Sequence, residues 1–141
     1  MTGTSYSFLA IAVNVVGDSP DSDTLANIVA GTPPGVPQNL RRAEGVPPQD
    51  TKITLGWDAP ASNGGSVVTG YTLYWNLGSL SEASQVLTTT SGSITFHTAE
   101  GLTPGTSYIF KALATNIIND GQATAAVTLI AAEAPGAPTD I

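Results

Sequence analysis

Side chains that could carry out chemistry are few in this sequence and lie far apart. His97 is the only histidine, and the 141 residues include no cysteine. A Ser-His-Asp arrangement would need that one imidazole beside a nucleophile, and the absence of cysteine excludes thiolate nucleophiles, disulfides and Cys-type zinc sites. We therefore expect His97 to be an exposed strand residue, and we expect no catalytic residue and no enzyme activity.

The densest acidic stretch offers the one candidate metal site. Asp18, Asp21 and Asp23 lie within six residues, and their carboxylates are the oxygen ligands that calcium prefers. The stretch lacks the glycine spacing and the terminal glutamate of an EF-hand loop, which favours a plain hairpin turn. The glycine-rich segment 63–66 is followed by no lysine and no helical pattern, so it predicts a turn and not a phosphate site. We expect no metal and no other cofactor.

Charge and hydropathy exclude two classes of partner. The net charge is −7, and only four lysine and arginine residues are present, too few to neutralise nucleic acid or an acidic membrane surface. No run of about eighteen apolar residues occurs, so we expect no membrane insertion. Few lysines, with many Thr, Ser, Asn and Gly residues, favour an extracellular or cell-surface location, with a cytoskeletal or ciliary assembly as the alternative.

An internal repeat organises the chain. Residues 3–14 (GTSYSFLAIAVN) return as residues 105–116 (GTSYIFKALATN), 102 positions later, and residues 34–37 (PGVP) return as 135–138 (PGAP), 101 positions later. The two offsets differ by one because one loop is a residue shorter in the second copy. A unit of about one hundred residues suits a self-contained domain repeated along a chain, since solenoid repeats are much shorter.

The repeat divides the sequence into three parts. Residues 1–32 are predicted to be the last two strands of a preceding module, residues 33–132 a complete module, and residues 133–141 a linker with the start of the next module. Proline-rich junctions mark both boundaries, because proline cannot donate to a strand ladder and stiffens a short linker.

Within the complete module, apolar residues alternate with polar ones, which predicts strands. Ile53, Leu55 and Trp57 form one such series, and Tyr108, Phe110 and Ala112 form another. The alternation slips near Ile94, so the sequence leaves open whether Phe96 or His97 faces the core. The segment 119–121 (NDG) predicts a tight hairpin turn. The seven expected strands lie near residues 38–42, 53–57, 71–75, 85–89, 94–98, 108–114 and 125–129.

Several motifs resemble the fibronectin type III module: Pro37 before the first strand, Trp57 ending the second, and the segments 63–65 (NGG), 70–75 (GYTLYW) and 102–108 (LTPGTSY). The resemblance implies an all-β, immunoglobulin-like, seven-stranded Greek-key β-sandwich, preceded here by a β-hairpin from a partial module. It also implies that Trp57 lies between the sheets and that Tyr108 contacts the turn near Leu102. The expected structural core is Trp57, Tyr71, Leu73, Leu102, Tyr108 and Phe110.

Three functions are consistent with such a module. The first is a structural spacer in a large multi-domain surface, matrix or filament protein, whose partners are neighbouring modules or copies of the same protein. The second is an adhesion module that binds a protein or glycan through loops 58–67 and 117–122, where Ile117 and Ile118 suggest an apolar patch. The third is an accessory module of a secreted polysaccharide-degrading enzyme.

The amino-terminal hairpin raises a separate question. Two strands alone are marginally stable in water, yet residues 3–31 include Tyr6, Phe8, Ile28 and other apolar side chains. We expect this face to be covered either by another copy of the chain or by the remainder of a longer protein.

Overall fold

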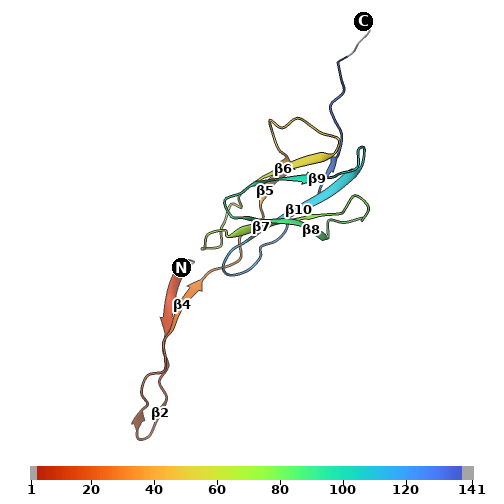
Figure 1. Cartoon of the computed structure of the whole chain (residues 1–141). Helices are drawn as coiled ribbons and strands as arrows, with labels where there is room; N and C mark the ends of the chain where they lie inside the picture. The colour runs from red at the N-terminus through yellow and green to blue at the C-terminus, as the bar shows by residue number, and fades with distance from the viewer. Residues whose placement is uncertain (1–2, 138–141) are drawn as a thin grey trace.

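The computed structural model describes residues 3–137, whose regular elements are all β-strands (Figure 1). A long hairpin comes first and a β-sandwich follows it. The described chain leaves the sandwich at the end opposite to the hairpin (Figure 1). Among residues 3–137, no helix is long and apolar enough to cross a membrane.

Seven strands form the sandwich in two antiparallel sheets. One sheet has the order β11-β10-β7-β8 and the other the order β5-β6-β9, so β6 and β7 are consecutive in the chain but lie in different sheets. This is the crossing pattern of an immunoglobulin-like sandwich. The strands are β5 (Gln38–Arg42), β6 (Lys52–Asp58), β7 (Gly70–Trp75), β8 (Gln85–Ser91), β9 (Phe96–Glu100), β10 (Ser107–Thr115) and β11 (Val127–Ile130).

The core forms where inward-facing side chains of the two sheets meet. Because side chains alternate along a strand, Ile53, Leu55 and Trp57 of β6 all point to one face, and all three are buried. The Trp57 ring packs edge-on against Tyr71 of β7, with ring centroids 5.5 Å apart. The six core residues expected from the sequence belong to this cluster: Trp57, Tyr71, Leu73, Leu102, Tyr108 and Phe110.

Strand β9 differs from the sequence expectation in position and resolves the question of which residue faces the core. It begins at Phe96, two residues later than expected. His97 pairs with the buried Leu55, whereas Phe96 pairs with Gly56 and remains 63% exposed. His97 therefore lies on the inward side, at its rim, and is half-buried. The expectation of an exposed histidine was wrong because the register places it opposite a core residue.

The turn between β10 and β11 also lies earlier than the sequence predicted. Asn116 N donates to Asn119 O, at 3.2 Å, so the chain reverses over residues 116–119. Asp120 already pairs back with Thr115, and Gly121 N donates to Ala114 O, at 2.8 Å. The segment 119–121 is thus the start of the returning arm and not the turn itself.

The amino-terminal hairpin has two paired regions joined by extended chain (Figure 1). Strand β1 (Thr4–Phe8) pairs with β4 (Leu25–Ala30), and β2 (Val13–Asn14) pairs with β3 (Gly17–Asp18) at the tip. One edge of β1 has no partner strand among the described residues, whereas its repeat equivalent β10 is paired on both edges, with β7 and β11.

The hairpin repeats the backbone hydrogen bonds of β10 and the arm that follows it. A glycine with positive φ opens each copy, Gly3 at 81° and Gly105 at 76°, and its N–H donates to a carbonyl at the end of the returning arm. Farther along, the same cross-strand pairs recur. The matched bonds are Gly3 N to Ala30 O (2.6 Å) with Gly105 N to Ala131 O (2.7 Å), and Ser22 N to Ala10 O (2.9 Å) with Thr124 N to Ala112 O (2.8 Å).

A β-bulge explains why the two repeat offsets differ by one residue. Between the pairs Tyr6 with Ile28 and Phe8 with Leu25, β4 contains one residue more than β1. Asn27 lies there with a φ of 61°, a left-handed conformation that asparagine tolerates better than most residues. The corresponding β10–β11 pairing has no such irregularity, so the extra residue of the first copy is absorbed in this bulge.

Candidate functional site

His97 lies in β9 near the ion pair of Lys52 and Glu100. Burial lowers its pKa, and the nearby Glu100 partly opposes that shift. Glu100 in turn accepts a hydrogen bond from Lys52 Nζ at 2.8 Å, which lowers the pKa of that carboxyl group. These residues form a pair of charges and a half-buried imidazole along β6 and β9, with no nucleophile hydrogen-bonded to the ring among the described residues.

The aspartates of the first hairpin do not form a metal site in the described structure. No group of three or more His, Asp or Glu side chains within residues 3–137 is arranged to hold a metal ion. Asp18 lies in β3, and it is the serines between the aspartates that make the ordered contacts. Ser19 Oγ accepts from Ala12 N at 3.0 Å and Ser22 Oγ accepts from Ala10 N at 2.9 Å, which ties the two arms together.

The residues that do converge lie where the hairpin meets the sandwich. We call this region the module junction: residues 31–35 of the connecting chain together with loops 62–65 and 116–121. Thr32 N donates to Gly64 O at 2.9 Å, and Gly35 N donates to Ser62 O at 2.8 Å. Two backbone bonds thus fix the connecting chain to the first loop at this end of the sandwich.

Asn116 connects the three segments of the module junction. Its side chain is only 4% exposed, and Nδ2 donates to Thr32 O at 2.9 Å and to Asn63 O at 2.8 Å. Its Oδ1 accepts from Ile118 N at 2.9 Å and Asn119 N at 3.2 Å. One buried amide group therefore pairs with two backbone donors and two backbone acceptors, and leaving such a buried group unpaired is costly.

Glycine allows the backbones to approach closely at this junction. Gly64 has a φ of 73°, and a Cβ there would collide with the carbonyl of Thr32. A Cβ on Gly121 would collide in the same way with the carbonyl of Pro34. Both loops thus need a residue without a side chain where the connecting chain crosses them.

The two loops expected to form a ligand surface are therefore largely engaged within the chain. Ile118 lies beside Gly31, where an added Cβ would come within 3.2 Å of its Cγ1. Ile117 is 69% exposed, and Val67 is also exposed, so a small apolar surface remains exposed at the edge of the module junction. At the base of the first loop, a hydrogen bond from Asn39 lowers the pKa of Asp58, and Arg41 adds to that effect.

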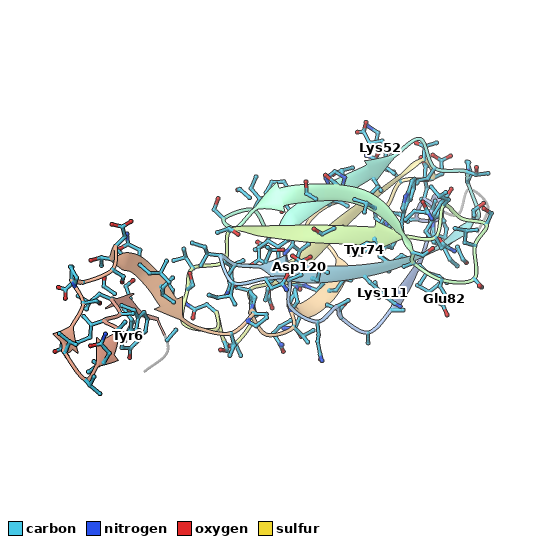
Figure 2. All side chains as sticks on the ribbon, turned by 90° about the horizontal axis from the view of Figure 1, so that it is seen from below. Tyr6, Lys52, Tyr74, Glu82, Lys111 and Asp120 are labelled. Atoms are coloured by element: carbon cyan, nitrogen blue, oxygen red, sulfur yellow. The ribbon has the colours of Figure 1, made fainter. Side chains whose placement is uncertain are left out.

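The apolar face of the hairpin is open, unlike its repeat equivalent. Tyr6 is 40% exposed, whereas Tyr108, its counterpart 102 positions later, is 4% exposed. Phe8 is 54% exposed and its counterpart Phe110 is fully buried. Figure 2 shows Tyr6 in the hairpin, well apart from the sandwich side chains. The hairpin thus presents to solvent a face that the complete module buries.

Fold and site together define a class: an immunoglobulin-like β-sandwich module, preceded at its amino-terminal end by a β-hairpin that docks against two of its loops. The family model "Fibronectin type III domain" matches residues 35–130, and the chain belongs to this family. The expected contact of Tyr108 is present, since its hydroxyl accepts from Thr103 N at 2.9 Å, beside Leu102.

The relatives that match are much longer proteins. Titin of Drosophila melanogaster is 34% identical over 119 residues, which is 82% of this chain and 1% of titin. Ephrin type-A receptor 3 of Danio rerio is 33% identical over 109 residues, 77% of this chain and 10% of the receptor. A crystal structure of titin domains superposes with a TM-score of 0.70 at 21% identity, covering 92% of this chain and 41% of that one. That likeness shows the fold.

Sequence reasoning did not identify the role of Asn116. A signal was present, because the repeated segment ends on Asn14 in one copy and Asn116 in the other. The contacts themselves were not predictable, since the partners of Asn116 lie 84 and 53 residues away along the chain.

Proposed function

We propose that this chain is a non-catalytic structural module of a large multi-domain protein, in which fibronectin type III units follow one another and maintain a fixed spacing. The module junction is the observation that carries the proposal. Loops that a free-standing module would offer to a ligand instead bind the connecting chain through Thr32, Gly35 and Asn116. The described chain then leaves from the opposite end of the sandwich, as a spacer requires (Figure 1).

The proposal includes the origin of the hairpin as the last two strands of a preceding module. Its hydrogen bonds match those of β10 and the following arm, and its exposed aromatic residues are those that the complete module buries. Five further strands would then cover Tyr6 and Phe8, as β5 to β9 cover Tyr108 and Phe110. On this proposal, residues 133–137 belong to the linker that leads to a following fibronectin type III module.

A binding role is the second candidate, favoured by the exposed Ile117 and Val67 at the edge of the junction. In that case a protein or glycan partner would contact both loops from the side that the connecting chain leaves free.

We place the parent protein outside the cell or at its surface. The small number of lysines and the receptor among the relatives support this location. Labelling the parent protein in intact, unpermeabilised cells tests the proposed location.

A fusion protein tests the structural proposal with the chain's own sequence. Residues 1–104 are followed directly by residues 3–141, so that Gly3 of the second copy takes the position of Gly105. The second hairpin then follows the five strands that it lacks in the single chain. Hydrogen exchange on residues 3–31 is compared between the two copies and with the unfused chain, with sedimentation across a concentration series.

We expect the second copy of the hairpin to be protected while the first copy exchanges quickly and the fusion protein remains a monomer. The two copies have the same sequence and are each other's control. Equal exchange in both copies would refute the assignment of the hairpin. Protection of the unfused chain that rises with its concentration would show instead that copies of the chain cover the hairpin.

A further inference from the structure

Asn14 and Asn116 occupy equivalent positions in the repeat and form the same turn. Asn14 Oδ1 accepts from Val16 N at 2.8 Å and from Gly17 N at 3.2 Å. Asn116 Oδ1 accepts from the residues two and three positions later at 2.9 and 3.2 Å. The carbonyl half of each side chain thus closes the local turn, which fixes the direction of the amide half.

The amide halves differ. Asn116 Nδ2 donates to a carbonyl of the connecting chain and to a carbonyl of the neighbouring loop. Asn14 Nδ2 makes no hydrogen bond to any residue within 3–137, and the turn around it is open to solvent, with Val15 fully exposed. The tip of the hairpin therefore has the same turn and the same amide donor as the module junction, but no connecting chain and no neighbouring loop from residues 3–137 lie beside that donor.

We propose that the turn 14–17 is a second docking surface, which binds the connecting chain that enters the preceding module. The inference rests on the proposed function. Its ligand is an extended segment with a free carbonyl group before a proline pair, of the kind that Thr32 provides before Pro33 and Pro34. Asn14 would donate to that carbonyl and to the first loop of the preceding module.

The far end of the complete module supports a directional assembly of this kind. Gly3 lies against the neighbouring loop, where an added Cβ would be 2.5 Å from Gly65 O, whereas its counterpart Gly105 has open space around it. Each module would thus present a turn asparagine at one end and an accommodating glycine at the other. Such a contact is heterologous, so it continues along a chain and does not close into a symmetric dimer.

Asparagine to aspartate substitutions separate the two halves of the amide. Asn116→Asp keeps the acceptor oxygen that closes the turn but replaces the two donations with a carboxylate facing two carbonyl oxygens. In the unfused chain we expect the protection factor of the Thr32 amide to fall about tenfold or more, since two hydrogen bonds are lost. Asn14→Asp is the matched control and should leave it unchanged. Below the pKa of the introduced carboxyl group, one donation returns and protection should partly recover.

The fusion protein tests Asn14 itself. In the second copy of the fusion protein, the side chain of Asn14 is expected to face Thr32 and Asn63 of the first copy. We therefore expect Asn14→Asp in the second copy to lower the protection factor of the Thr32 amide in the first copy about tenfold. If the second hairpin is protected but this substitution has no effect, the proposed function stands and the docking surface is refuted. An unprotected hairpin refutes both. Unchanged Thr32 protection in the unfused Asn116→Asp chain would refute the role of the asparagine at every junction.

Discussion

Tyr108→Phe is the substitution whose effect follows most directly from the structure. The ring of Tyr108 is buried, with its centroid 6.1 Å from that of Trp75 and 6.4 Å from that of Phe110. Phenylalanine retains this packing and removes only the hydroxyl that accepts from Thr103 N. A single hydrogen bond of this kind contributes about 1 kcal/mol net, and up to about 2 kcal/mol if the donor is left dry. Thr103 is exposed, so we expect a loss of about 1 kcal/mol.

Urea unfolding followed by tryptophan fluorescence measures this loss. The chain contains two tryptophans, Trp57 and Trp75, and both lie in the sandwich, so the signal reports on the complete module and not on the hairpin. With a slope of about 1 kcal/mol per molar urea, the midpoint should fall by about 1 M. An unchanged slope would show that only stability has changed.

Tyr6→Phe is the matched control for this experiment. Tyr6 is the repeat equivalent of Tyr108, and its side chain is partly exposed in a hairpin that contributes nothing to the fluorescence signal. We expect its midpoint to move by less than about 0.5 M, as for surface substitutions generally. If both variants unfold at the same midpoint as the unchanged chain, the turn contact of Tyr108 does not stabilise the module and the reasoning fails.

Two further predictions concern the junction and pH. Gly64→Ala should lower the free energy of unfolding more than Gly45→Ala, because both glycines have φ near 70° but only at Gly64 would the new Cβ collide with Thr32. The left-handed conformation alone costs about 1 kcal/mol for alanine. Equal losses for the two variants in urea unfolding would argue against a tight junction. His97 has a lowered pKa when folded, so the unfolded chain binds its proton first as pH falls below about 6.5, and stability should decline there until the folded pKa is passed. His97→Gln should flatten this part of the stability profile, and an unaltered slope would assign it to other groups.

The alternation of apolar and polar residues correctly predicted the buried face of those strands that have one fully buried face. In β6 and β10 every second residue enters the core, and misplacing the register by one residue would expose all of them. Near β9 the alternation did not predict the buried face, because a large apolar residue, Phe96, pairs with Gly56 and faces outward while the half-buried His97 faces inward. The face that each of these residues takes is set by its pairing with β6, and that pairing is a property of the sheet and not of β9 alone.

The position of the turn after β10 was predicted wrongly for a different reason. An Asn-Asp-Gly sequence favours a tight hairpin, but Asn116 closes the turn three residues earlier with its own side chain. That choice depends on the contacts of Asn116 with Thr32 and Asn63, which are distant in sequence. The same long-range contacts made the two loops part of a junction, although their composition alone suggested a free binding surface.

The repeat also provides an internal comparison of two similar segments in two surroundings. The matched backbone hydrogen bonds of the hairpin and of β10 with its returning arm have nearly equal lengths, although one copy is exposed and the other buried. The hydrogen bonds of the strand pair are therefore the same in both surroundings, while burial depends on the other five strands. A two-stranded sheet is marginal in water, and the module junction holds only the base of this hairpin. On the proposed function, strands of a preceding module cover Tyr6 and Phe8 and stabilise the outer part of the hairpin, which is why the two copies in the fusion protein should differ in exchange although their sequences are identical.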